Sequence, residues 1–254
     1  MDIVLVPGFW LDGSSWDAVT PSLERAGHRT VALTLPGLES EDSDRSGIRL
    51  SDHVAAVVEA IDRLSGDVVL VGHSGGGPIA HGAADARPDR VRRMVHVDTW
   101  PLTHGRCVND ELPVIDASIP LPDWSVFEPE DLVDLDDGLK AMFRARAVPE
   151  PLAVASDPQV LTDDRRHDIP TTIVCCEFTG EQLSKDTLTL GAPIVAGDGS
   201  SAPMSSMAHS VKSASAGLTW QSRRGFFVGS AVTWNLPSED RTSYGLPSQS
   251  RDFV

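Results

Sequence analysis

The amino-acid sequence predicts an α/β fold, a doubly wound and mostly parallel sheet with helices on both faces, in a single domain. Two observations lead to this prediction. Through the first hundred residues, short runs that are apolar throughout alternate with longer segments whose apolar residues recur at helical spacing. Such alternation is typical of parallel strands that are buried on both sides and linked by helices. A length of 254 residues fits one sizeable core.

The elements follow in order along the chain. Strands are expected within 2–8, 28–37, 67–72 and 90–101, and helices within 14–27, 50–66 and 76–89. In the second helix, Ser51 and Asp52 can cap the first turn, and the valines and isoleucine that follow recur at helical spacing.

Residues 101 to about 165 are irregular, and we interpret them as a small cap inserted over the carboxyl edge of the sheet, helical around 131–146. Such an insertion can roof a substrate pocket. The sheet resumes at 169–178. From about 184 to 254 the chain becomes rich in serine and glycine, with a last strand expected within 225–236 and no other structure predicted.

Composition excludes several classes of protein. The formal charge of −16 would repel nucleic acid and anionic membranes. No apolar stretch is long enough to span a bilayer, and the opening "MDIVLVPGF" lacks the basic start of a signal peptide, so we expect a cytoplasmic protein. Cys107, Cys175 and Cys176 form neither a C-x-x-C pair nor a disulfide framework, and we expect them to be reduced and buried.

The stretch "DVVLVGHSGGGPIAHG", residues 67–82, carries the chemistry. Its Gly72-His73-Ser74-Gly75-Gly76 segment has G-x-S-x-G spacing between an expected buried strand and an expected helix, which is the context of a nucleophile elbow. A strained turn there would lift the Ser74 hydroxyl clear of the sheet. The N–H of Gly75 and the start of the helix could then stabilise an oxyanion.

The same glycines allow two other interpretations. Gly75-x-Gly77-x-x-Ala80 matches a dinucleotide-binding fingerprint, and Asp98 follows at the end of the next strand. However, that fingerprint should begin where the strand ends, whereas Gly72 and His73 intervene here. The remaining alternative is a tight turn with an incidental serine. We favour the elbow.

The chain resembles the α/β-hydrolase superfamily, and more narrowly its small esterase and hydroxynitrile-lyase-like branch. The resemblance rests on "VLVPGFWLDGSSW" (4–16), "VALTLPG" (31–37), "VVLVGHSGGG" (68–77) and "RMVHVDTWP" (93–101), and "RRHDIPTTIVCCEF" extends it to about 178. It implies the hydrolase fold, catalysis on a small-molecule substrate, and no metal or other cofactor. It says little about which substrate.

The resemblance also implies roles for individual residues. Ser74 would be the nucleophile, with His73 at the variable elbow position beneath the oxyanion loop. The "PGFW" loop would supply a second oxyanion donor from the backbone N–H of Phe9, with Trp10 as the alternative. The acid is open between Asp98, which has the cleaner strand-end position, and Glu177, which superfamily order favours.

The expected catalytic histidine is displaced from its usual place. Relatives end with a strand and a Gly-His turn, whereas Glu239 and Asp240 stand at the counterpart here. The only histidine after His167 is His209, which could act as the base if the tail forms the loop after the last strand. Alternatively, the tail is a divergent or frame-disrupted ending with feeble or no hydrolysis. We expect solvated or loop positions for His28, His53, His104 and His167.

Two functional hypotheses follow. The first is a serine hydrolase that cleaves a small carboxylic ester or lactone through Ser74 and a backbone oxyanion hole. The second is a hydrolase-fold protein without hydrolytic activity, such as a lyase, a cyclase or a ligand binder. Phe9, Trp10, Trp100, Trp124 and Phe143 could line an apolar pocket, although core packing explains them equally well.

Overall fold

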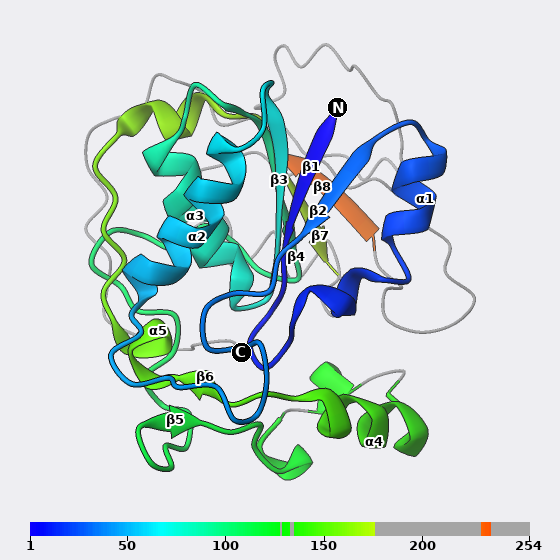
Figure 1. The fold of residues 1–254 in the computed structure, drawn as a ribbon, viewed down its shortest axis with the longest axis vertical. Coiled ribbons are helices and arrows are strands. Elements are labelled where there is room, and N and C mark those ends of the chain that lie inside the picture. The colour runs from blue at the N-terminus through cyan, green and yellow to red at the C-terminus, as the bar shows by residue number, and fades with distance from the viewer. Residues whose placement is uncertain (128, 133–134, 176–229, 235–254) are drawn as a thin grey trace, which may run out of the picture.

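The computed structural model describes residues 1–127, 129–132, 135–175 and 230–234, and it confirms the α/β prediction (Figure 1). A six-stranded sheet has the order β2-β1-β3-β4-β7-β8. Its strands are β1 (Asp2–Val6), β2 (Arg29–Ala32), β3 (Val68–His73), β4 (Val91–Val97), β7 (Thr171–Cys175) and β8 (Ser230–Trp234). The first five are parallel, and β8 runs antiparallel to β7.

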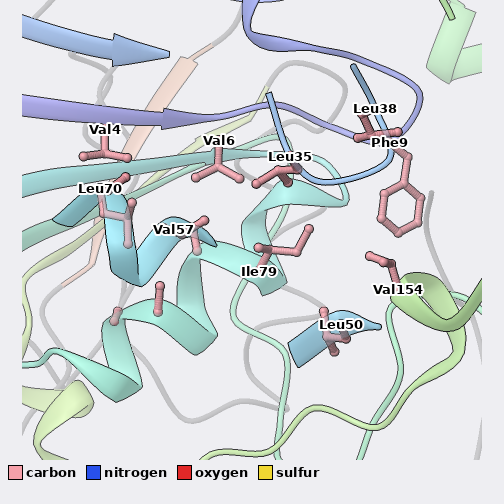
Figure 2. Packing of buried hydrophobic residues seen from close by; sticks show 14 of the residues in the cluster. Val4, Val6, Phe9, Leu35, Leu38, Leu50, Val57, Leu70, Ile79 and Val154 are labelled. Atoms are coloured by element: carbon pink, nitrogen blue, oxygen red, sulfur yellow. The ribbon is translucent and has the colours of Figure 1, made fainter. Parts of the chain in front are cut away.

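Successive side chains of a strand point to opposite faces of the sheet. Both faces of this sheet are buried, so both are apolar. In β1, Val4 and Val6 join the larger core cluster, whereas Ile3 and Leu5 join the smaller one. Figure 2 shows the larger cluster, in which the strand residues face the helices that follow in the chain. This two-sided burial explains why the strands are apolar throughout.

Helices cover the two faces unequally. α2 (Leu50–Asp62) and α3 (Gly76–Ala86) lie side by side on one face, and α1 (Thr20–Arg25) lies on the other (Figure 1). α1 is shorter than the helix expected within 14–27, because residues Gly13–Trp16 form a separate 3-10 helix, η1, capped by Asp12. No helix among the described residues is long and apolar enough to cross a membrane.

The start of α2 differs in detail from the predicted cap. The helix begins at Leu50, and the Asp52 carboxylate accepts the backbone N–H of Arg49 at 2.8 Å. Asp52 therefore closes the first turn from inside the helix, where a negative charge also suits the helix dipole. Ser51 lies within the helix rather than before it.

The segment expected to form the cap, residues 101–165, holds a two-stranded sheet of β5 (Ser118–Ile119) and β6 (Glu150–Pro151), with helices α4 (Asp137–Arg146) and α5 (Leu152–Ser156). These four elements lie beyond the carboxyl edge of the six-stranded sheet (Figure 1). Two 3-10 helices, η2 (Trp124–Val126) and η3 (Pro129–Leu132), precede α4. α4 begins later than the expected 131, at the point where the Asp136 carboxylate accepts the N–H of Leu139.

The predicted late strands are both present. β7 occupies the middle of the expected 169–178 segment, and β8 lies inside the expected 225–236 segment. The rest of the predicted serine-rich tail lies outside the described residues.

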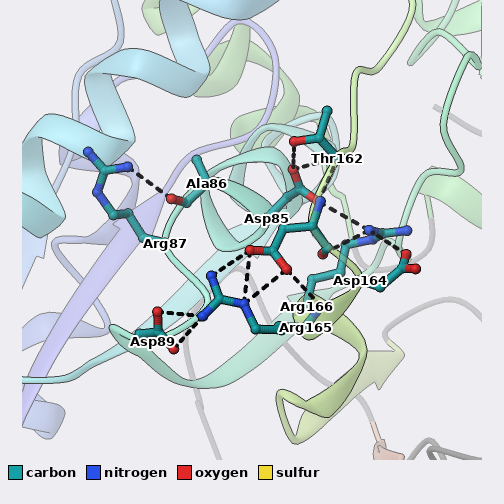
Figure 3. Close-up of polar contacts among 9 residues, drawn as sticks. Asp85, Ala86, Arg87, Asp89, Thr162, Asp164, Arg165 and Arg166 are labelled. Atoms are coloured by element: carbon teal, nitrogen blue, oxygen red, sulfur yellow. Dashed lines mark hydrogen bonds and ion pairs between the residues drawn. The ribbon is translucent and has the colours of Figure 1, made fainter.

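A buried carboxylate fixes the connection that enters β7. Asp85, near the end of α3, is 5% exposed and accepts the backbone N–H groups of Thr162 and Asp163 (Figure 3). Nη1 of Arg166, in the 3-10 helix η4 (Asp164–Asp168), also donates to Oδ1 of Asp85 at 3.1 Å. These bonds satisfy the buried charge and hold the start of β7 beside β4.

Two histidines lie between α3 and the sheet. His96 on β4 is fully buried, and its ring centroid lies 6.2 Å from that of His81 on α3. Burial lowers the pKa of His96 to about 3 and that of His81 to about 4. Neither ring nitrogen of His96 has a hydrogen-bond partner among the described residues. The His96 ring therefore stays neutral in the folded protein at neutral pH.

We expect the His96→Leu substitution to protect the protein against acid. Unfolded His96 takes up a proton as the pH falls below about 6.5, whereas folded His96 does not. Because folding depresses the pKa of His96, the contribution of this residue to the unfolding free energy is complete above about pH 6.5 and is lost as the pH falls below that value. Between pH 8 and pH 5 the loss is about 2 kcal/mol of unfolding free energy from this group.

Urea unfolding of both proteins at the two pH values measures this difference. Between pH 8 and pH 5 the variant should lose about 2 kcal/mol less unfolding free energy than the wild type. It should be at least as stable at pH 8, because it lacks a buried ring that no described residue hydrogen-bonds. Equal losses in the two proteins would contradict the prediction.

Candidate active site

Ser74 occupies the sharp turn between β3 and α3. Its φ is 45°, in the left-handed region that residues other than glycine rarely adopt. Two backbone hydrogen bonds hold the turn: Ser74 N–H donates to the carbonyl of Val97 at 3.0 Å, and Gly77 N–H donates to the carbonyl of Ser74 at 2.8 Å. Ser74 itself is half-buried. The geometry is that expected of a strained strand-turn-helix elbow.

The glycines after Ser74 let the loop that follows β1 cross the start of α3. A Cβ on Gly76 would lie 2.1 Å from the carbonyl oxygen of Pro7, and a Cβ on Gly75 would lie 2.4 Å from Cδ1 of Phe9. Both distances are far below any van der Waals contact. The loop could not lie this close to the serine if either position carried a side chain.

This crossing weighs against the dinucleotide interpretation. A phosphate cradle needs open space over the glycines at the start of the helix. Here the Pro7 carbonyl occupies the space over Gly76, and the Thr99 side chain lies where a Cβ on Gly77 would be.

The residues of the "PGFW" loop lie beside the serine. A Cβ on Gly8 would come within 3.2 Å of the Ser74 Cβ and 2.9 Å of Nδ1 of His73, so this loop packs directly on the elbow. No acceptor among the described residues takes the backbone N–H of Phe9 or of Gly75. No described residue therefore competes with a bound oxygen for these two N–H groups.

Trp10 has different partners. Its backbone N–H donates to Oε2 of Glu150 at 3.3 Å, and its indole N–H donates to the carbonyl of Ile119 at 3.0 Å. Its φ of 64° is also left-handed. Because the Trp10 N–H is already bonded, we leave it out of the candidate oxyanion donors.

Asp98 ends the neighbouring strand. β4 pairs with β3 so that Val97 lies opposite His73, which brings Asp98 level with Ser74 at the carboxyl edge. Asp98 has a φ of 52°, and its N–H donates to the carbonyl of Val174 on β7 at 2.7 Å. It is partly exposed.

His73, the last residue of β3, packs against the "PGFW" loop, because Nδ1 of its ring lies 2.9 Å from the place of a Cβ on Gly8. Its ring is nearly perpendicular to the Trp16 ring, at an interplanar angle of 86° and with the centroids 6.4 Å apart. Burial lowers the pKa of His73, and the nearby negative charge of Asp98 opposes that shift. A neutral ring is therefore favoured at this position.

Two candidate residues from the sequence, Glu177 and His209, lie outside the described residues. Glu177 follows the last residue of β7 by two positions, which leaves both acid candidates open.

Aromatic rings run from the loop into the cap. The Phe9 and Trp10 rings pack edge to face with their centroids 6.1 Å apart, and the centroids of the Trp10 and Phe127 rings are 6.2 Å apart. Trp124 continues the series, because the centroid of its ring lies 5.6 Å from that of Phe127 and 5.9 Å from that of Phe143. Phe9 and Trp10 are 5% and 4% exposed, so these two rings belong to the core.

Sequence reasoning missed a buried polar pair beneath the loop. His53, expected to be solvated, is fully buried on α2, and Nδ1 of its ring faces Oε1 of the equally buried Glu150 at 3.7 Å. His53 precedes Val57 by one helical turn, so the apolar face of the helix could have indicated its burial. Nothing in the sequence pattern marks Glu150.

Other features of the described part of the chain do not add to this site. A cavity of about 590 Å³, lined by residues such as Met1, Asp67 and Pro170, lies at the amino ends of the strands, opposite Ser74. Among the described residues, no group of three or more His, Cys, Asp or Glu side chains could hold a metal ion. Cys107 forms no disulfide among the described residues, and it is half-buried rather than fully buried as expected.

Comparisons with known proteins identify the family of the chain. The model of the alpha/beta hydrolase family matches residues 3–211. A carbendazim-hydrolyzing esterase of Nocardioides sp. (strain SG-4G) is 33% identical over 115 residues, which cover 44% of this chain and 47% of the esterase. Salicylic acid-binding protein 2 of Nicotiana tabacum is 36% identical over 95 residues, covering 36% of each chain. The matched regions thus span less than half the length of these relatives.

Solved structures share the fold. An extracellular alpha/beta-hydrolase from a Paenibacillus species superposes with a TM-score of 0.59 at 23% identity, over 68% of this chain and 76% of that one.

We expect the Gly75→Ala substitution to destabilise the protein by about 1–3 kcal/mol, because the new methyl group overlaps the buried Phe9 ring. Gly66→Ala is the matched control, since its Cβ would meet nothing within 4 Å. Urea unfolding of both variants measures the difference. Equal stability of the two variants would show that the loop does not press on Gly75.

Proposed function

Because the chain belongs to the alpha/beta hydrolase family, we propose that it is a serine hydrolase that cleaves small carboxylic esters or lactones. The observation that carries this proposal is the strained turn at Ser74. The backbone N–H groups of Phe9 and Gly75 lie on the segments that flank this turn, and no described residue accepts them.

In the proposed reaction, Oγ of Ser74 attacks the ester carbonyl carbon and gives up its proton to an imidazole base. The carbonyl oxygen becomes an oxyanion, which the N–H groups of Phe9 and Gly75 stabilise. The intermediate then collapses, the C–O bond to the alcohol breaks, and the alcohol leaves with the proton. Water, activated by the same base, hydrolyses the acyl-serine and restores the enzyme.

We assign the base to His209 and the residue that orients it to Asp98 or Glu177. Asp98 is supported by its place level with Ser74 on the adjacent strand. A carboxylate at the edge of the sheet can hold the imidazole in the tautomer that accepts the serine proton and can stabilise the imidazolium that forms.

The substrate class rests on the relatives and on the surroundings of the loop. Two of the relatives are named as an esterase and a pyrethroid hydrolase. In this chain, the half-buried cap rings of Trp124, Phe127 and Phe143 lie next to the buried rings of the loop and make the region apolar. Such surroundings favour an ester with an apolar or aromatic acyl group.

We expect a fluorophosphonate probe to add one covalent mass increment to the wild type and none to Ser74→Ala. His209→Ala should label at least a hundredfold more slowly, because the serine loses its base. Ser51→Ala, an exposed serine on α2, should label like the wild type. Intact-mass measurement follows each reaction, with circular dichroism to verify the fold. An unlabelled wild type would favour the non-hydrolytic alternative, and normal labelling of His209→Ala would remove His209 from the mechanism.

Amide substitutions distinguish the two acid candidates. If Asp98 orients the base, Asp98→Asn should lower kcat by about a thousandfold or more, because the amide favours the wrong imidazole tautomer, whereas Glu177→Gln should lower kcat by less than about tenfold. Hydrolysis of p-nitrophenyl butyrate supplies both rates. The reverse pattern would assign the acid to Glu177.

A further inference from the structure

Trp10 links the candidate oxyanion loop to the cap through three hydrogen bonds. Its N–H donates to Glu150, its indole N–H donates to Ile119, and its carbonyl accepts the N–H of Val148 at 2.9 Å. All three partners belong to the cap. A tryptophan with a φ of 64° is strained, and strained backbone persists only where its surroundings fix it.

The Glu150 bond sets the direction of the peptide next to the proposed oxyanion donor. Pro7 and Gly8 are pressed on the elbow on one side of Phe9, and the Trp10 N–H is held on the other. With both flanks fixed, the Phe9 N–H has little freedom to turn. The same bond keeps the Trp10 N–H away from the oxyanion.

We propose that Glu150 is a positioning residue, which holds the Trp10 peptide so that the Phe9 N–H stays directed at the oxyanion beside Ser74. This inference rests on the proposed function, because the oxyanion belongs to that reaction. Glu150 touches no substrate and acts through the backbone of Trp10.

The surroundings of Glu150 keep its carboxyl neutral. The side chain is fully buried, and burial raises its pKa to about 8 despite the N–H of Trp10 and the positive charge of Arg45. His53 faces it from α2, and burial lowers the pKa of His53 to about 4, although the negative charges of Asp52 and Glu39 oppose that shift. Burial therefore favours the uncharged form of both members of the pair at neutral pH.

The chemistry of the pair is complementary in this state. Nε2 of His53 lies 2.8 Å from the carbonyl oxygen of Pro36, which can only accept, so Nε2 carries the proton of the neutral ring. The bare Nδ1 then faces Oε1 of Glu150 at 3.7 Å, which is longer than a hydrogen bond, and neither atom has a hydrogen-bond partner among the described residues. A protonated Oε1 would carry its O–H on the side of this bare nitrogen. Oε2 remains free to accept the Trp10 N–H.

A neutral carboxyl also suits the proposed reaction. Glu150 accepts a hydrogen bond from the residue next to the oxyanion donor, so a negative charge on it would oppose the negative charge that develops on the substrate. Ionisation above about pH 8 should therefore slow the reaction. A glutamine has the same acceptor oxygen and cannot ionise.

The test compares Glu150→Gln and Glu150→Ala with the wild type, using p-nitrophenyl butyrate between pH 6 and pH 9.5. At pH 7, Glu150→Ala should lower kcat by about tenfold to a hundredfold with KM changed less than about threefold, because positioning supports only the transition state. Glu150→Gln should keep kcat within about threefold. Its rate should also lack the decline above about pH 8 that the wild type shows.

Ile61→Val, a conservative change at a fully buried site on α2, is the control for lost stability and should leave kcat and KM unchanged. The proposal is overturned if Glu150→Ala retains kcat, if glutamine is as damaging as alanine, or if only KM changes.

Amide hydrogen exchange of residues 7–12, followed by mass spectrometry in the same variants, separates this proposal from the proposed function. Exchange should be faster in Glu150→Ala and unchanged in Glu150→Gln. The proposed function fails if the wild type does not hydrolyse the ester, or if Ser74→Ala hydrolyses it equally well. In that case, faster exchange in Glu150→Ala but not in Glu150→Gln still supports the anchoring of the loop. Equal exchange in all three proteins would overturn the anchoring as well.

Discussion

The approach of the loop after β1 to the start of α3 is the constraint on which the rest of the site depends. The Pro7 carbonyl and the Phe9 ring lie where side chains on Gly76 and Gly75 would be, and the Ser74 turn adopts a left-handed backbone between them. This close packing places the N–H groups of Phe9 and Gly75 on the two segments that flank the serine. The sheet supports the turn from below, because Ser74 N–H bonds the last residue of β4.

The cap completes this arrangement from the other side. Its residues bond both backbone groups of Trp10 and its indole, so the loop is held between the elbow and the cap. A residue as bulky as tryptophan with a positive φ needs such support. The buried carboxyl that provides one bond is in turn packed against His53 of α2, which connects the core helix, the cap and the loop beside the serine.

The sequence analysis predicted those features that depend on local pattern. The apolar strands follow from burial on both faces, and the elbow follows from the spacing around Ser74. Glu150 was missed because its partner Trp10 is 140 residues away, and no local pattern reports such a contact. His53 was expected in solvent, although its helical spacing from Val57 places it on the buried face. α1 was expected to be longer because the pattern does not separate a capped 3-10 turn from the helix that follows.

The most direct test of the account is a crystal structure of the protein after reaction with a phosphonate ester. Oγ of Ser74 should be bonded to phosphorus, with one phosphonyl oxygen about 2.7–3.1 Å from the backbone nitrogens of Phe9 and Gly75. The Trp10 N–H should remain on Glu150. A phosphonyl oxygen that points to solvent, or that takes the Trp10 N–H instead, would contradict the assignment of the oxyanion hole to this loop and this turn.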